Sequence, residues 1–187
     1  MSDKRQDIAR AAIEAFAERG FHGTAVPDIA RRAGVGAGTI YRYFKSKEAL
    51  VNELYREAKS ALVMAVTQGF PPPGSSPRQQ FAELWRRLAR YVVENPKTFK
   101  FMELLHHAPY LDRESLAVEQ RFFEFGEQFF AYTSGQQLTK SLPPATLIVF
   151  VWAAFVGMIK AGHEGRIDLT EQTIETFESC CWEAIRA

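Results

Sequence analysis

The chain has 187 residues, enough for one well-packed core or for a small module joined to a larger one. A hydrophobic content of 47% and a charged content of 24% are those of an ordinary soluble globular protein. No N-terminal apolar stretch resembles a signal peptide, and the longest apolar run, residues 145–159, is too short to span a bilayer. The two cysteines are adjacent and form no disulfide framework, so we expect a cytoplasmic protein without a membrane partner.

The net charge of +1 conceals an uneven distribution along the chain. Residues 1–47 contain nine Lys or Arg and five Asp or Glu, which gives +4, whereas the remainder carries −3. A basic end joined to an acidic body indicates a polyanionic partner for the basic end alone.

Four helices are predicted in the first 68 residues, because apolar side chains recur there at helical spacing. The first carries the stripe Ile8, Ala12, Ala15 and Phe16 and can end at Gly20. The second begins near Val26, with Pro27 in its first turn, and the third spans about 36–44. Ser46 can cap a fourth helix, which continues to about residue 68.

The segment FPPPGSSPR, residues 70–78, cannot continue a helix and separates two layers of the protein. Beyond it, helices are predicted near 79–94, 97–107, 113–133, 144–161 and 171–186, with Thr170 capping the last. Strand alternation is nearly absent. The predicted fold is all-α with about nine helices, divided into a small N-terminal domain (residues 1–47) and a larger C-terminal domain (residues 48–187).

The stretch GVGAGTIYRYF, residues 34–44, combines closely spaced glycines with large polar side chains. Two short helices joined by a glycine-containing turn and braced by a longer helix form a helix-turn-helix, whose second helix enters the major groove of DNA. Residues 36–38 leave room for a close approach, and the side chains after them can meet bases and phosphates. The alternative interpretation is a flexible turn followed by aromatic residues of the core. It fits Phe44, but Tyr41 and Arg42 point away from the stripe formed by Ile40 and Phe44.

Residues 8–50 resemble the DNA-binding domain of TetR-family transcriptional regulators. The shared features are AAIEAFAERGF, T-x-V-x-D-I-A-x-x-A-G-V and G-T-I-Y-x-Y-F-x-S-K-E-A-L. The resemblance implies contacts with the backbone of operator DNA, and with bases at the positions matching Gly38, Tyr41 and Arg42. Together with the motif, it gives the predicted DNA-binding residues Thr24, Gly36, Ala37, Gly38, Thr39, Tyr41, Arg42, Tyr43 and Lys47.

Three positions depart from the family pattern. Gly36 stands where a Ser cap is common, Ala37 where a polar or basic residue is common, and Ala25 where a second Thr or Ser is common. The lost hydroxyls and charge should reduce the number of phosphate contacts, although Ala37 could meet a thymine methyl group.

The part of the chain after residue 69 holds twelve of the 15 phenylalanines, and the helix near 113–133 is apolar on two faces. A helix that packs against the core on one side needs only one apolar face. Two such faces indicate that this helix is surrounded by other helices or borders a cavity. A packed core and a ligand pocket both fit the pattern. The resemblance implies a small-molecule effector pocket, here for a largely apolar effector. The predicted lining is Phe99, Met102, His106, Phe122, Phe125, Phe129, Trp152 and Phe155.

Other chemistry-bearing residues carry weaker signals. The adjacent His106 and His107 point about 100° apart on a helix and lack further ligands, so no metal or cofactor is expected. Glu103 and Glu119 are interpreted as solvated, with contact to a cationic ligand as the alternative. Cys180 and Cys181 are interpreted as small buried residues, with a redox switch as the alternative. No catalytic triad, phosphate loop or carboxylate pair is indicated, so no enzyme is expected.

The last two helices predict a homodimer, because residues 145–159 are apolar nearly all round and the final helix carries Ile174, Phe177, Cys181 and Ile185. A two-fold axis would place two recognition helices about 34 Å apart on a palindromic operator. The sequence thus predicts a ligand-responsive DNA-binding regulator, with a repressor favoured and activation left open. The alternative is an all-α small-molecule binding or carrier protein whose helix-turn-helix is only a scaffold.

Overall fold

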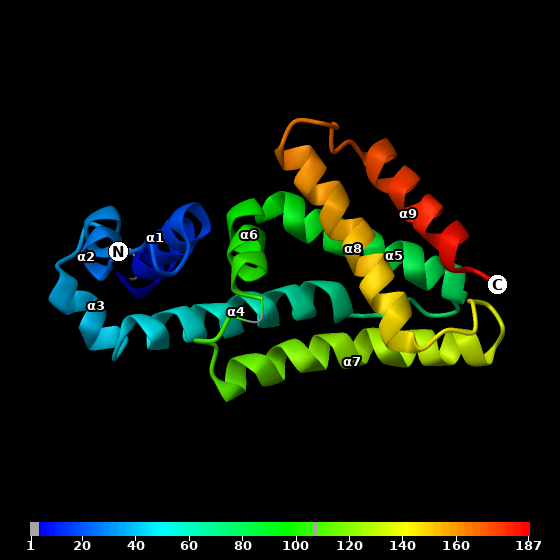
Figure 1. The fold of residues 1–187 in the computed structure, drawn as a ribbon, viewed down its shortest axis with the longest axis horizontal. Helices are drawn as coiled ribbons and strands as arrows, with labels where there is room; N and C mark the ends of the chain where they lie inside the picture. Colours follow the sequence, from blue (N-terminus) through cyan, green and yellow to red (C-terminus); the bar gives the residue numbers. More distant parts are fainter. Residues whose placement is uncertain (1–3, 107) are drawn as a thin grey trace. The chain divides into compact units, whose positions relative to one another are not determined.

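A computed structural model describes residues 4–106 and 108–187. Within these ranges it contains nine helices, whose course is drawn in Figure 1. They are α1 (Lys4–Arg19), α2 (Val26–Arg32), α3 (Ala37–Tyr43), α4 (Lys47–Thr67), α5 (Pro77–Glu94), α6 (Pro96–Leu105), α7 (Arg113–Gly135), α8 (Pro144–His163) and α9 (Glu171–Ile185). Apart from an isolated bridge between Thr139 and Arg186, the described residues show no β-structure, so the all-α prediction is confirmed.

Several helices begin or end at glycine or proline residues. Gly20 and Gly34 both have φ +67°, a left-handed conformation that closes α1 and α2 at low steric cost. Pro96 occupies the first turn of α6, as proline can. This helix ends at Leu105, two residues before the predicted end, with the approaching Pro109 disfavouring helical backbone before it. His107 lies outside the described residues.

The chain forms two compact units, each built from two stretches of sequence. The first comprises Met1–Leu62 and Glu94–Glu119, and the second comprises Val63–Val93 and Gln120–Ala187. In the first unit α1 packs against α2 and α6, and α2 packs against α3. In the second, α8 packs against α9. Both α4 and α7 contribute residues to both units. These units are groups of residues in mutual contact, whereas the boundary predicted after residue 47 separates two functions, so the two divisions describe different properties.

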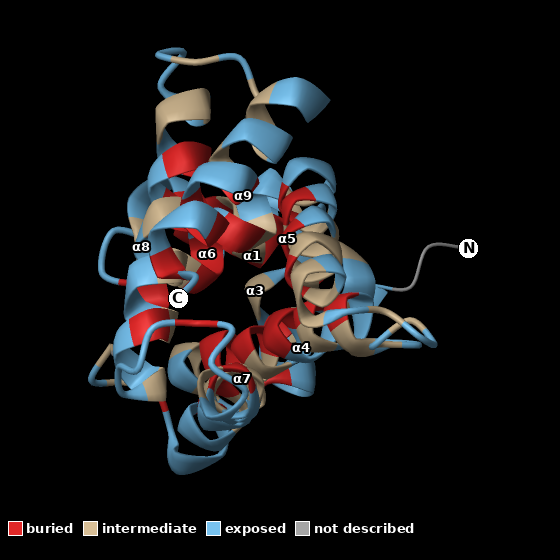
Figure 2. Cartoon of the chain, turned by 90° about the vertical axis from the view of Figure 1, so that its right-hand side faces the viewer, coloured by how far each residue is buried: buried red, intermediate tan, exposed pale blue. Residues whose placement is uncertain are grey.

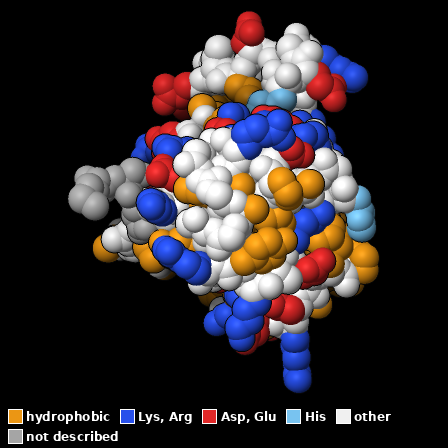
Figure 3. Space-filling view, turned by 90° about the vertical axis from the view of Figure 1, so that its left-hand side faces the viewer, with side chains coloured by type: hydrophobic (Ala, Val, Ile, Leu, Met, Phe, Trp, Pro, Cys, Tyr) orange, Lys and Arg blue, Asp and Glu red, His pale blue; other side chains and the backbone are white. Residues whose placement is uncertain are grey.

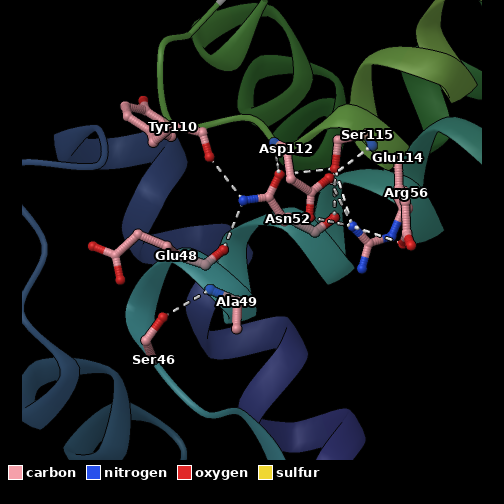
Figure 4. A network of polar contacts seen from close by, with 9 residues as sticks. All are labelled: Ser46, Glu48, Ala49, Asn52, Arg56, Tyr110, Asp112, Glu114 and Ser115. Atoms are coloured by element: carbon pink, nitrogen blue, oxygen red, sulfur yellow. Dashed lines mark hydrogen bonds and ion pairs between the residues drawn. The ribbon is translucent and has the colours of Figure 1, made fainter.

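In the first unit, a polar network centred on Asn52 connects α4 to the start of α7 (Figure 4). The Asn52 amide donates to the Glu48 and Tyr110 carbonyls at 2.9 and 2.8 Å. Its oxygen accepts from the Asp112 N–H and the Ser115 hydroxyl, both at 2.8 Å. Asn52 is 3% exposed, so its hydrogen-bonding groups are paired inside the protein rather than with solvent.

A second buried polar cluster surrounds Glu119, which is only 4% exposed, so its interpretation as a solvated residue was wrong. Its carboxylate accepts from the Tyr55 hydroxyl at 3.0 Å and lies 3.6 Å from the Lys59 ammonium. Burial by itself raises the pKa of this carboxyl, but Lys59 and the hydrogen bond from His106 outweigh it and hold the pKa below its usual range. Burial also lowers the pKa of Lys59.

The second unit has an aromatic core on which α8 and α9 lie. The ring of Trp85 meets Phe155 edge to face at 5.3 Å, and Phe81 lies 5.3 Å from Trp182 on α9. In Figure 2 both α8 and α9 carry buried and exposed residues, as helices covered on one side do. The helix α8 has 20 residues, so by length and composition it could cross a membrane, and the expectation that the apolar run was too short was wrong. Of its most apolar window, 28% is buried within the protein.

Replacing Asn52 by Asp should test the polar network. Asn52→Asp substitutes an acceptor for the amide that donates to two carbonyls, so buried groups lose their partners. We expect the free energy of unfolding to fall by about 1–3 kcal/mol, measured by urea denaturation. Ser60→Ala, at an exposed position of the same helix, is the control and should change it by less than about 0.5 kcal/mol. Equal stability of both variants would contradict a structural role for the network.

Candidate nucleic-acid interface and ligand cavity

The helix α3 is held by one face and presents the other to solvent. Ile40 and Phe44 are 1% and 2% exposed, whereas Tyr41 and Tyr43 are 53% and 40% exposed. Arg42, between the tyrosines, is exposed, and its guanidinium lies 5.8 Å from the centre of the Tyr43 ring. Two hydroxyls and a guanidinium therefore stand together on a rigid support, as a surface that contacts bases and phosphates requires.

The start of α3 is sterically open. Gly36 is the N-cap and provides no side-chain hydrogen bond to the first turn. A Cβ atom added at Gly36 or Gly38 would meet no heavy atom of the protein within 4 Å. These glycines are therefore not required by internal packing. Ala37, between the two glycines, and Thr39, after them, are half-buried.

Two of the predicted DNA-binding residues make internal contacts at the α1–α2 loop. Thr24 is buried, and its hydroxyl donates to the carbonyls of Ala15 and Gly20 at 3.1 and 2.8 Å. The Lys47 ammonium donates to the Thr24 carbonyl at 2.7 Å and lies 4.1 Å from the centre of the Phe21 ring. Both residues thus fix the start of α4 against this loop. Their contacts with DNA remain predictions.

The positive charge of the N-terminal region is concentrated by internal ion pairing. Five arginines of this region form salt bridges with carboxylates of the first unit: Arg5, Arg10, Arg19, Arg31 and Arg32. Within the described residues, no ion pair is seen for Arg42 or Lys45. Figure 3 shows the face on which α2 and α3 lie, where Lys and Arg side chains stand around hydrophobic ones. Among the described residues of this region, the cations for which no ion pair is seen are Lys4 at the start of α1, Arg42 on α3, and Lys45 and Lys47 after it.

An apolar cavity of about 100 Å³ lies in the second unit, between α5, α7 and α8. Of the predicted lining residues it brings together Phe122, Phe125, Phe129 and Trp152. Phe99, Met102 and His106 belong to the first unit instead. Phe155 is buried and stacks on Trp152 at 5.7 Å. The remaining lining residues are Val66, Phe81, Leu84, Trp85, Leu88, Phe123, Gly126, Phe130, Ile148 and Val151.

The α5 wall of this cavity was missed, although the sequence carried a signal for it. Phe81, Trp85 and Leu88 recur at helical spacing and define the apolar stripe of α5. The spacing identifies a buried stripe but does not distinguish a cavity wall from packed core. Lys45 was also missed as an exposed cation next to α3.

The cysteines differ from each other. Cys180 is exposed, so its interpretation as a buried residue was wrong, whereas Cys181 is buried. Burial raises the pKa of the Cys181 thiol to about 12, which makes it a poor nucleophile. Among the described residues, no group of three His, Cys, Asp or Glu side chains could hold a metal ion.

Comparison with known proteins connects both sites to one family. Residues 8–54 match the model for bacterial regulatory proteins of the tetR family, and residues 55–187 match the tetracyclin repressor-like C-terminal domain. The helix-turn-helix and the helical domain after it therefore define a transcriptional regulator, and the chain belongs to the TetR family.

Individual relatives agree with this assignment. The HTH-type transcriptional regulator RutR of Escherichia coli (strain K12) is 28% identical over all of this chain and 92% of its own length. The fatty acid metabolism regulator protein of Bacillus subtilis (strain 168) is 48% identical over 54 residues, which cover only 28% of that relative. A TetR-family regulator from Marinobacter aquaeolei VT8 has the same fold, with a TM-score of 0.86 at 24% identity over 98% of this chain and 95% of that one.

The open start of α3 leads to a prediction that separates stability from DNA binding. Gly38→Ala places a methyl group where the protein has free space and where alanine favours the helix by roughly 1 kcal/mol. We expect an unchanged or higher Tm, but a fall in DNA affinity of about tenfold, the scale of one good contact. Calorimetric melting and a fluorescence anisotropy titration measure the two quantities.

Gly135→Ala is the matched control, because an added Cβ at this helical glycine also meets no heavy atom within 4 Å. It should leave DNA affinity unchanged. If Gly38→Ala bound DNA as tightly as the wild type, close approach at this position would be disproved.

Proposed function

We propose that this TetR-family protein is a homodimeric repressor that binds a palindromic operator and is released by a small, largely apolar effector. It acts in the cytoplasm and regulates transcription rather than catalysing a reaction. The domain of residues 1–47 reads DNA, and that of residues 48–187 binds the effector and forms the dimer.

The observation that carries this proposal is the exposed row Tyr41, Arg42 and Tyr43 on a helix anchored by buried Ile40 and Phe44. Large polar aromatics are costly to order and gain little from exposure to solvent. Their rigid presentation beside an open helix start, with Lys45 close by, is explained by recognition of a phosphate backbone and base edges. A carrier protein would have no use for this arrangement.

The helix α4 supports a mechanism for release. It begins at Lys47, which contacts the loop before α2, and its residue Val66 lines the apolar cavity. An effector that binds one conformation of the cavity more tightly can bias α4 and change the spacing of the two recognition helices. A coupling free energy of about 1–3 kcal/mol, or 5–150-fold in operator affinity, is typical of such systems.

The outer face of α8 supports dimerisation. Val149 and Phe150 are 65% and 48% exposed, and Ala153 and Gly157 continue the same exposed stripe. On α9, Cys181 and Ile185 are buried within the unit, so the surface offered to a partner is instead the one that includes Cys180. A self-complementary apolar stripe with small residues fits an isologous helical bundle.

Binding to the DNA that flanks the protein's own gene should test the reading function. Tyr41→Ala and Arg42→Ala should each weaken specific binding by about 1–3 kcal/mol in an anisotropy titration with nonspecific competitor. Affinity of the wild type should fall steeply with salt, because phosphate contacts release counterions.

Gln136→Ala, at an exposed position after α7, is the control and should bind like the wild type. Equal affinity of the Tyr41 and Arg42 variants and the wild type would favour the carrier function, in which the helix-turn-helix is only a scaffold.

A charge on the exposed stripe of α8 should dissociate the dimer. Phe150→Lys places an ammonium in the proposed interface, where its desolvation is unfavourable, and sedimentation velocity should then detect monomers at micromolar concentration. Met64→Lys changes an equally apolar residue, 64% exposed on α4, and should leave the dimer intact. Dissociation by both variants, or by neither, would contradict an interface through the last two helices.

A further inference from the structure

One residue that lines the apolar cavity, Trp85, carries a polar group whose hydrogen bonding the packing does not satisfy. Trp85 is 2% exposed, and its indole Nε1 is shielded from solvent. Among the residues that the structure describes, this nitrogen is the buried side-chain polar atom without a hydrogen-bond partner. A buried tryptophan N–H normally finds an acceptor, and leaving one unpaired is unfavourable.

Trp85 forms a wall of the cavity on one side and of a groove between α5 and α9 on the other. Its ring is fixed by aromatic neighbours, with Phe81 at 6.1 Å and Phe155 at 5.3 Å between ring centres. A phenylalanine would provide similar apolar surface without the unpaired donor. The indole N–H is therefore a feature that packing alone does not require.

The rest of the cavity wall contains no charged side chain. Six phenylalanines contribute to it: Phe81, Phe122, Phe123, Phe125, Phe129 and Phe130. An ionised carboxylate or ammonium in such surroundings would lose its hydration without gaining a partner. The part of a ligand that lies inside the cavity is therefore expected to be neutral.

The size of the cavity sets a further limit. Its volume is about 100 Å³. Apolar protein cavities of about 150 Å³ accommodate benzene. The cavity is smaller than that, so the part of the effector that occupies it is no larger than one ring.

We propose that the effector is a neutral, single-ring aromatic or alicyclic compound with a hydrogen-bond acceptor, such as a ketone, ester or amide oxygen, that pairs with the Trp85 indole N–H. This inference rests on the proposed ligand-responsive function and specifies the chemistry of its effector. The acceptor satisfies the buried donor, and the ring covers the surrounding phenylalanines. A carboxylate inside the cavity is disfavoured, because its ionised form finds no cation in the wall.

A matched set of probes tests the proposal on the full-length protein. Acetophenone carries the acceptor, α-methylstyrene has the same shape with a CH₂ group in place of the oxygen, and benzoate adds a charge. Affinities for the wild type and for Trp85→Phe are measured by calorimetry. Because the two neutral probes differ in hydrophobicity, the informative quantity is how their affinity ratio changes between the two proteins.

We expect the preference for acetophenone over α-methylstyrene to fall by about three- to tenfold in Trp85→Phe, the range of one recovered hydrogen bond. Benzoate should bind the wild type at least about tenfold more weakly than acetophenone. An unchanged ratio, or benzoate binding as tight as that of acetophenone, would overturn the proposal. So would the failure of both neutral probes to bind.

A second measurement does not depend on the folding of the variant. The protein has three tryptophans, so ¹H–¹⁵N spectra of the wild type contain few indole resonances. Acetophenone should move the Trp85 indole proton downfield, and α-methylstyrene should move it much less. Equal shifts from the two probes would overturn the proposal.

Operator binding without any probe is measured separately. If the operator is bound but the probes show no selectivity, the inference fails and the DNA-reading function stands. If the selectivity is present but no probe alters operator affinity, the chemistry of the cavity is supported and release by the effector fails.

Discussion

The burial of Ile40 and Phe44 determines which side of α3 another molecule can reach. Because both side chains are almost fully enclosed, the helix cannot rotate without exposing them, and Tyr41, Arg42 and Tyr43 stay on the outer face. Because Ile40 and Phe44 anchor the helix further along, the glycines at its start need no packing contacts of their own. The orientation of this exposed face thus depends on two buried apolar residues.

Ion pairing determines which positive charges of the N-terminal region remain without a carboxylate partner. The sequence places nine cations among residues 1–47, but most of the arginines neutralise carboxylates of the same unit. Exposed pairs of this kind contribute little stability, so their main effect is on the shape of the electrostatic field. Lys4, Arg42, Lys45 and Lys47 form no ion pair among the described residues, and Arg42 and Lys45 stand beside the tyrosines. The net charge of residues 1–47 therefore does not show where on the surface the unpaired positive charges lie.

Much of the fold could be predicted from the sequence, because glycine and proline act locally. Gly20, Gly34 and Pro96 end or begin helices wherever the chain folds, and the inner stripe of α4 follows from spacing alone. The cavity could not be predicted in this way. Phe99 and Phe122 have similar apolar patterns, yet only Phe122 lines the cavity, because that outcome depends on which helices face each other. The burial of Glu119 likewise required Lys59 from another helix, a pairing that no local pattern indicates.

The Asn52 network and the apolar cavity differ in how completely their polar groups are paired, and this difference bears on how an effector would act. The Asn52 network pairs each of its buried groups, so a displacement of the first half of α4 against the start of α7 would break several hydrogen bonds at once. The cavity instead is lined by buried and half-buried phenylalanines and by Trp85, whose indole donor has no acceptor, so its native packing leaves a favourable interaction unmade. A ligand can shift a conformational equilibrium only by its differential affinity, and under the proposed function that difference would arise at the cavity.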